Sequence, residues 1–281
     1  MDTIKLNNGV EMPLLGFGVF QIEDFKECEE SVLLALKTGY RLIDTAAGYN
    51  NEEAVGSAIQ KSGIDRKDIF ISSKIWIQYD GYEGTKKSFG ETLEKLQTDY
   101  LDLFLIHMPF GDYHGMWRAM EELYKEGKIK AIGVCNFLED RLVDLILTHD
   151  VAPAINQVEL HPFDQQQSLQ KVMDKYDIKA MAWGPLAEGQ NQIFSNETLV
   201  NIGKKYNKTA AQVVIRWFRE EDIITIPKSV HPERIEENFA VDDFQLTKDE
   251  VKEIESLDLK KPLILDVTSL DEVYRLHGLV Q

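Results

Sequence analysis

Eight short apolar runs recur along the chain, and segments with a helical spacing of apolar residues separate them. The runs are LLGFG (14–18), RLIDT (41–45), IFISSKI (69–75), LDLFLIH (101–107), IKAIGV (129–134), PAINQV (153–158), KAMAW (179–183) and IITIP (223–227). Near-continuous apolar runs of this length are typical of parallel strands that are buried on both faces. Strands that alternate with helices about eight times in roughly 250 residues favour an α/β fold of the (β/α)8 TIM-barrel type over an open sheet.

Both ends of the chain add elements to this barrel. Asn8-Gly9 lies between two short alternating stretches and predicts an N-terminal β-hairpin before the first barrel strand. The segment 207–222 predicts a second helix before the eighth strand, and 247–257 predicts an extra C-terminal helix after the barrel. The tail 258–281 would then return over the outside or the mouth of the barrel. No linker rich in proline, glycine or serine divides residues 1–281, so we expect a single domain.

Composition limits the classes of partner. Hydrophobic residues make up 43% of the chain, and 31 basic against 48 acidic side chains give a net charge of −17. A charge of this sign repels phosphate, so we expect no nucleic-acid partner and no anionic membrane. No secretory signal or membrane-length apolar run is visible, and Cys28 and Cys135 are too few for a disulfide framework, so we expect a cytoplasmic protein. The six histidines lack metal-ligand spacing, and no metal is expected.

Ionisable side chains stand at the ends of three consecutive predicted strands. Asp44 ends the second strand, Lys74 the third and His107 the fourth, and Tyr49 lies in the loop after the second. Because active sites of TIM barrels lie at the carboxyl ends of the strands, these side chains would meet at one mouth. Each has a plainer interpretation alone: Asp44 as a helix cap, Tyr49 as a half-exposed loop aromatic, His107 as a core histidine and Lys74 as a solvated strand end.

Together the four residues fit the reduction of a carbonyl group. A buried lysine beside a phenol favours the phenolate, so Lys74 would lower the pKa of Tyr49 from about 10 towards neutrality. Asp44 would keep that lysine charged. Tyr49 could then give a proton to a developing alkoxide, and His107 could donate a hydrogen bond to the same oxygen. The hydride would come from a separate cofactor.

Further motifs follow one another over nearly the whole chain. They are LLGFGVFQ (14–21), LIDTAAGYNNEEAVGSAI (42–59), ISSKIW (71–76), LFLIHMP (103–109), AIGVCNF (131–137), INQVELHP (155–162), AWGPLAEG (182–189) and IPKSVHPERIEEN (226–238). In this set and order the chain resembles the aldo-keto reductase superfamily, and within it the short bacterial branch of diketogluconate and glyoxal reductases. The resemblance implies a monomer that reduces a small aldehyde or ketone to an alcohol with NADPH.

The resemblance also implies roles for individual residues. Tyr49 would be the general acid, Lys74 and Asp44 the pair that tunes it, and His107 the group that orients the carbonyl. For the cofactor it implies Asn136, Gln157 and Trp183 at the nicotinamide, Gly184, Pro185 and Leu186 at the pyrophosphate, Lys228, Ser229, Val230 and Arg234 at the adenosine 2′-phosphate, and Glu237 and Asn238 at the adenine, with further contacts from Gly18, Val19, Phe20, Asp44 and Cys135. Substrate would contact Phe20, Tyr49, Trp76, His107 and Met108.

Four positions depart from the common family pattern. Cys135 replaces a frequent serine and is a poorer hydrogen-bond donor, so it would hold the nicotinamide more loosely. Met108 and Phe20 stand where many members have tryptophan, and Met108 fits either a permissive pocket or a simple gap filler. His231 replaces a small residue near the expected 2′-phosphate and could add pH-dependent affinity.

Two other functions stay open. A cofactor-sensing module with little turnover, like the potassium-channel β subunits of the same fold, could carry the same four residues. Tight NADPH binding without turnover would favour that function. A Schiff-base lyase that uses Lys74 would be trapped by borohydride, but Asp44 would keep the amine charged and non-nucleophilic.

Overall fold

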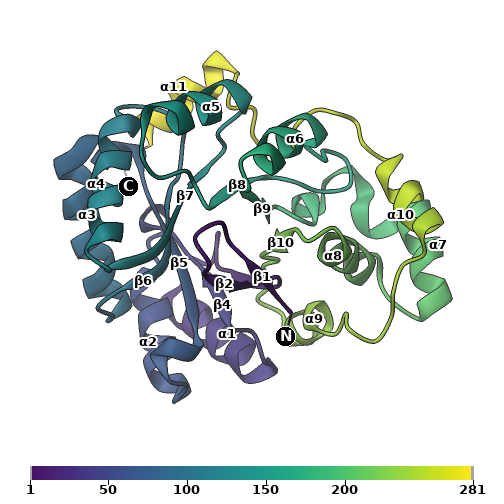
Figure 1. Cartoon of the computed structure of the whole chain (residues 1–281). Helices are drawn as coiled ribbons and strands as arrows, with labels where there is room; N and C mark the ends of the chain where they lie inside the picture. Colours follow the sequence, from purple (N-terminus) through teal and green to yellow (C-terminus); the bar gives the residue numbers. More distant parts are fainter. Residues whose placement is uncertain (1, 280–281) are drawn as a thin grey trace.

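The central feature of the computed structural model, which describes residues 2–279, is a parallel eight-stranded sheet (Figure 1). Each strand pairs with the next along the chain, and every predicted run holds one of them. The strands are β3 (Phe17–Gly18), β4 (Leu42–Asp44), β5 (Phe70–Ile75), β6 (Leu101–Ile106), β7 (Ile129–Cys135), β8 (Ile155–Glu159), β9 (Lys179–Trp183) and β10 (Ile224–Thr225). A parallel bridge between Leu15 and Thr225 joins the two edges, with the Gly16 amide 2.8 Å from the Thr225 carbonyl. The predicted TIM barrel is confirmed.

Helices surround this barrel on the outside, except that the last of them lies at its mouth. They are α1 (Phe25–Thr38), α2 (Glu52–Ser62), α3 (Gly81–Leu96), α4 (Tyr113–Lys125), α5 (Glu139–Thr148), α6 (Gln167–Lys175), α7 (Glu197–Tyr206), α8 (Ala210–Glu220), α9 (Pro232–Phe239), α10 (Lys248–Glu255) and α11 (Leu270–Gly278). The second helix predicted before the eighth strand is α8, and the predicted C-terminal helix is α10. Among the helices of residues 2–279, none has the length and apolar character of a membrane span.

An antiparallel hairpin of β1 (Thr3–Lys5) and β2 (Glu11–Pro13) closes the amino-terminal end of the barrel. Its turn contains Gly9 at a φ of 88°, a conformation that glycine adopts without steric cost. Leu6 and Met12 of the hairpin segment are buried in the same cluster as barrel residues such as Leu42 and Phe70. The hairpin therefore seals one end with apolar side chains, and the chemistry is left to the other end.

Side-chain alternation along the strands separates the barrel interior from the helix-facing layer. Leu42, Phe70, Leu103 and Leu105 belong to the apolar cluster of the interior, whereas their strand neighbours such as Ile43 pack in the cluster that includes the surrounding helices. Further along the same inward-facing rows, towards the carboxyl ends, the residues become polar. Asp44 follows Leu42 by two positions, Lys74 follows Phe70 by four, and His107 follows Leu105 by two. The side chains of Asp44, Lys74 and His107 therefore have the same inward direction as the apolar residues of the barrel interior.

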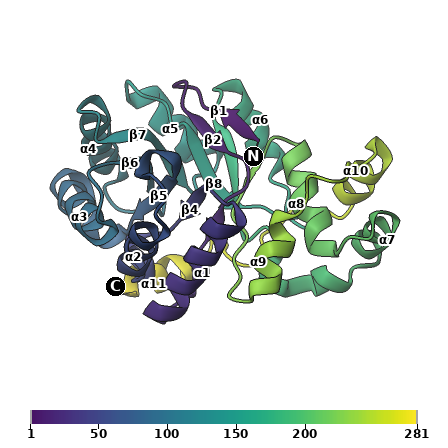
Figure 2. The same cartoon turned by 90° about the horizontal axis from the view of Figure 1, so that it is seen from below.

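The C-terminal tail lies over the mouth, one of the two places the sequence allowed. In Figure 2 the hairpin and α11 lie at opposite ends of the barrel. Leu276 of α11 is buried against a small apolar cluster that includes Trp76, Met108 and Phe110, and Leu265 packs against the same cluster. The tail therefore supplies part of the wall of whatever binds at the mouth.

Candidate active site

Asp44 and Lys74 form a buried ion pair at the end of β4 and β5. The Lys74 Nζ donates to Asp44 Oδ2 at 2.6 Å and to the Thr45 carbonyl at 2.8 Å. Burial alone would lower the pKa of Lys74, but the Asp44 carboxylate, with Tyr49 and Cys135, raises it above its ordinary value. Lys74 is therefore an ammonium. Asp44 caps no helix, since Asn51 occupies the N-cap position of α2.

Tyr49 ends a short 3-10 helix, η1 (Ala47–Tyr49), and its ring lies above this pair. Lys74 Nζ is 4.8 Å from the ring centroid of Tyr49. Burial raises the pKa of Tyr49 to about 12, against the opposing effect of Lys74. The lowered pKa expected from the sequence is therefore wrong for this structure, because desolvation of the phenolate outweighs the lysine charge. Tyr49 keeps its proton at neutral pH, which is the form that a general acid needs.

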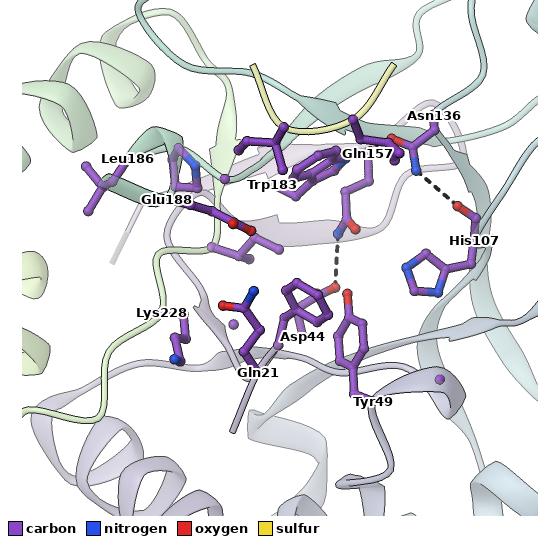
Figure 3. A pocket seen from close by; sticks show the side chains of 18 of the residues that line it. Gln21, Asp44, Tyr49, His107, Asn136, Gln157, Trp183, Leu186, Glu188 and Lys228 are labelled. Carbon is purple, nitrogen blue, oxygen red and sulfur yellow. Dashed lines mark hydrogen bonds between the residues drawn. The ribbon is translucent and has the colours of Figure 1, made fainter. Parts of the chain in front are cut away.

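His107 faces Tyr49 across the mouth, with 5.5 Å between the ring centroids (Figure 3). The His107 ring also packs edge-on against Trp76, with 5.0 Å between the centroids. Burial, followed by the charge of Lys74, lowers the pKa of His107 well below its ordinary value, so the imidazole is neutral. Its Nδ1 is buried and has no hydrogen-bond partner within residues 2–279. A neutral ring donates one N–H and accepts at the other nitrogen. His107 is thus more than a satisfied core histidine.

Two amide side chains connect these residues to the neighbouring strands. Gln157 Nε2 donates to Asp44 Oδ1 at 3.0 Å, and Asn136 Nδ2 donates to the His107 carbonyl at 3.1 Å (Figure 3). The Trp183 indole donates to Asn136 Oδ1 at 2.8 Å. Asn136 has a φ of 62°, in the left-handed region of backbone conformation, which asparagine tolerates better than most other residues. The Asn136 backbone amide donates to the Gln157 carbonyl at 2.9 Å, so one network links the predicted nicotinamide residues to Asp44 and His107.

A cavity of about 520 Å³ opens in front of this network. The predicted residues that line it are Gly18, Phe20, Asp44, Tyr49, Trp76, His107, Met108, Asn136, Gln157, Trp183, Gly184, Pro185, Leu186 and Lys228. Lys74, Val19 and Cys135 are fully buried and do not line it. Burial raises the pKa of the Cys135 thiol, and its Sγ lies 3.7 Å from Gln157 Oε1. Lys74 and Cys135 therefore act on the cavity only through Asp44, Tyr49 and Gln157.

The remaining predicted cofactor residues follow β10, and of these only Lys228 lines the cavity. Lys228 is exposed at the cavity edge, and Arg234 is exposed on α9. In the described part of the chain neither side chain has a hydrogen bond or ion pair. Ser229 Oγ accepts from the His231 amide at 3.1 Å, and Glu237 Oε1 accepts from Thr209 Oγ1 at 2.7 Å. Val230 is half-buried and Asn238 is buried. The structure therefore leaves two basic side chains after β10, Lys228 on the cavity wall and Arg234 on α9, without a direct partner among residues 2–279, although the charge of Glu188 acts on Lys228.

Sequence reasoning missed about half of the cavity wall. The missed residues are Gln21, Gly48, Glu188, Gly189, Phe194, Ile226, Pro227, Ile264, Leu265, Arg275, Leu276 and Leu279. Those up to Pro227, apart from Phe194, lie within the sequence motifs and could have been found there. The five tail residues carry no motif, and their place depends on how the tail folds back over the mouth. No cluster of three or more His, Cys, Asp or Glu side chains within residues 2–279 is arranged to hold a metal.

Comparison with known proteins agrees with this geometry. The glyoxal reductase of Bacillus subtilis (strain 168) is 48% identical over 257 residues, which cover 91% of this chain and 92% of that protein. Methylglyoxal reductase DkgA of Escherichia coli (strain K12) is 45% identical over 263 residues, 92% of this chain and 94% of its own. The crystal structure of a Bombyx mori aldo-keto reductase in complex with NADP is 30% identical, covers 97% of this chain and 96% of its own, and superimposes with a TM-score of 0.89.

The predicted resemblance is confirmed by the family comparison itself. Residues 14–259 match the aldo/keto reductase family, a span that contains every barrel strand and all four residues of the mouth. With relatives at this level of identity over nine-tenths of its length, the chain belongs to the aldo/keto reductase family.

Proposed function

We propose that the protein is an oxidoreductase that reduces small aldehydes and ketones to alcohols with NADPH. The observation that carries the proposal is that Tyr49 and His107 face each other at the cavity, with Tyr49 next to the buried Asp44–Lys74 pair. The names of the glyoxal and methylglyoxal reductases, and the NADP complex of the insect relative, support the same chemistry.

Tyr49 is the proton donor in this proposal. Its phenol is protonated at neutral pH and points into the cavity, where it can give its proton to the oxygen of a reacting carbonyl. The ammonium of Lys74 stabilises the phenolate that remains, and Asp44 holds the ammonium in place. The neutral imidazole of His107 donates a hydrogen bond to the same oxygen and so fixes its position.

The residues around the cavity fit a dinucleotide with an extra phosphate. Trp183, Asn136 and Gln157 would hold the nicotinamide end beside Tyr49, and residues 184–186 would line the pyrophosphate. Lys228 and Arg234 are exposed and form no hydrogen bond or salt bridge within residues 2–279, and only the longer-range charge of Glu188 acts on Lys228, although the chain as a whole carries a charge of −17. Two exposed cations without a direct partner in so acidic a protein favour a bound phosphate. When bound, NADPH supplies the hydride.

The alternatives make different demands on the same residues. A Schiff-base lyase needs a neutral lysine, whereas Lys74 is buried, charged and bound to Asp44. A cofactor-sensing module needs the cofactor residues but no accessible acid. The cavity in front of Tyr49 gives a carbonyl compound access to the phenol, which favours turnover over sensing.

A carbonyl panel tests the proposed function. Loss of NADPH absorbance is followed with methylglyoxal, glyoxal and 4-nitrobenzaldehyde, and NADPH binding is measured separately by quenching of tryptophan fluorescence. We expect turnover of at least the small dicarbonyls. Tight NADPH binding with no turnover across the panel would support the sensing module in place of the reductase.

A further inference from the structure

A buried carboxylate at the end of β8 binds the C-terminal tail. Glu159 Oε1 accepts from the amides of Leu263 at 2.6 Å and Ile264 at 3.0 Å, and Oε2 accepts from the amide of Leu265 at 2.8 Å. Glu159 itself is almost completely buried. Three consecutive backbone amides, about a hundred residues further along the chain, therefore converge on one carboxylate; we call this contact the Glu159 anchor.

His161 completes the anchor from the barrel side. Its Nδ1 accepts from the amides of Phe163 at 3.2 Å and Asp164 at 3.1 Å, so its proton is on Nε2. Nε2 lies 3.1 Å from Glu159 Oε1 and donates to it. The carboxylate thus receives four N–H donors, three at Oε1 and one at Oε2. Charge-assisted hydrogen bonds to a buried carboxylate are stronger than neutral ones, so the anchor holds the tail firmly.

The anchored segment forms part of the cavity wall. Ile264 and Leu265 line the cavity themselves, and the chain continues from them into α11. There Leu276 is buried against Trp76 and Met108, two of the predicted substrate residues. Glu159 contacts none of the reacting groups. It fixes the position of the wall that faces Tyr49 and His107.

We propose that Glu159 is a positioning residue for substrate binding, which holds the tail as the outer wall of the carbonyl pocket. The proposal rests on the proposed function. Substrates that extend far enough to contact Leu265 and Leu276 depend on the anchor for their affinity. Small dicarbonyls that occupy only the space beside Tyr49 and His107 depend on it much less.

Glu159→Gln tests this proposal. Glutamine keeps the shape of the side chain, but its amide nitrogen cannot accept a hydrogen bond and opposes an N–H of the tail or of His161. With the larger aromatic substrate 4-nitrobenzaldehyde we expect KM to rise about tenfold, whereas kcat/KM for methylglyoxal should change by less than about threefold. Equal losses for both substrates, or no change for either, would overturn the proposal.

A matched variant separates positioning from general destabilisation. Glu121 is also a buried glutamate whose Oε1 accepts two backbone amides, from Asp150 at 3.1 Å and Val151 at 2.8 Å, but it does not line the cavity. Glu121→Gln should leave the ratio of the two substrates unchanged. A shift in that ratio as large as that of Glu159→Gln would contradict a specific role for the anchor.

Hydrogen exchange provides a readout that does not need turnover. In Glu159→Gln the amides of residues 263–265 should lose protection while the barrel strands keep theirs. If the wild-type protein reduced no carbonyl compound, the proposed function would fail, and this experiment would still show whether Glu159 holds the tail. Unchanged protection of these three amides would refute the anchor itself.

Discussion

The two ends of the barrel each contain a buried aspartate, and they use it differently. Asp102, near the amino-terminal end of β6, is 2% exposed and lies 2.8 Å from both Arg66 Nη1 and Lys130 Nζ. Asp44, at the mouth, is 1% exposed and lies 2.6 Å from Lys74 Nζ. The basic partners of Asp102 reach solvent, whereas Lys74 is enclosed. Water therefore stabilises the charges at one end, and at the other end the protein alone must do so.

The surroundings of the two aspartates explain the difference. Asp102 also accepts from the amide of Ile71 at 2.9 Å, and this end is sealed by the apolar hairpin. At the mouth, Tyr49 and His107 border a cavity, and His107 Nδ1 has no partner within residues 2–279. Where polar side chains are paired internally the end is structural, and where ionisable side chains such as Tyr49 and His107 line a cavity they can bind a ligand.

Replacing each aspartate by asparagine should separate the two roles, with the stronger effect at the mouth. Asp44→Asn leaves a buried lysine without its carboxylate, so we expect kcat to fall about 100-fold or more. The free energy of unfolding should fall as well, by about 3–5 kcal/mol. Initial rates at saturating NADPH and urea unfolding curves measure the two effects on one preparation.

Asp102→Asn is the counterpart at the closed end. Its basic partners become solvated, so the free energy of unfolding should fall by only about 1–3 kcal/mol, and kcat should stay within about twofold of wild type. A loss of kcat comparable to that of Asp44→Asn, at a temperature where both variants are folded, would remove the distinction between the two ends.

Two lysines at opposite ends of the barrel give a second comparison, in which we expect a smaller effect on cofactor binding. Lys228 stands unpaired beside the cavity, and Lys179, at the amino-terminal end of β9, lies 2.7 Å from Asp177. We expect Lys228→Met to raise the Kd of NADPH about tenfold and that of NADH by less than about twofold, because only NADPH carries the additional phosphate. Lys179→Met should change neither. Equal weakening of both cofactors by Lys228→Met would place the phosphate elsewhere.

The weakest effect concerns a carboxyl group beside the mouth. Burial, together with the charge of Glu159, raises the pKa of Asp164 to about 6 from 3.8. The folded protein thus keeps this proton up to about pH 6, whereas the unfolded chain loses it near pH 4, so the stability that the proton provides is lost as the pH rises through this window. We expect Asp164→Asn to be more stable than wild type by about 1 kcal/mol at about pH 7.5, and equal to it below about pH 4.

Glu250, on the outer helix α10, serves as a control because its pKa is shifted in the opposite direction to that of Asp164. Burial would raise its pKa, but hydrogen bonds from Tyr206, Thr247 and Lys205 lower it to about 2. Its stabilising contribution is present above about pH 4.5 and is lost as the pH falls towards 2. Urea unfolding of Glu250→Gln should therefore show a deficit at neutral pH that shrinks in acid. If Asp164→Asn and Glu250→Gln were both less stable than wild type at neutral pH, the opposite effects proposed for the two carboxyl groups would be contradicted.

Much of the barrel and of its mouth follows from local patterns. The alternation of strand residues already places Asp44, Lys74 and His107 in one inward-facing layer. The direction of the shift in the Tyr49 pKa does not follow, because it depends on whether burial of the phenol outweighs the charge of Lys74. The position of the tail over the mouth cannot be predicted from the sequence either. Glu159 binds backbone amides, which leave no trace in the identity of Leu263, Ile264 or Leu265.

Turnover by Tyr49→Phe, with NADPH binding measured on the same sample, decides whether the mouth is the catalytic site. In the proposed mechanism the phenol of Tyr49 supplies the proton while other residues hold the cofactor. We predict that kcat with methylglyoxal falls about 1000-fold and that the Kd of NADPH stays within about threefold. Full turnover by Tyr49→Phe would show that the proton comes from another group and would contradict the assignment of the mouth as the catalytic site.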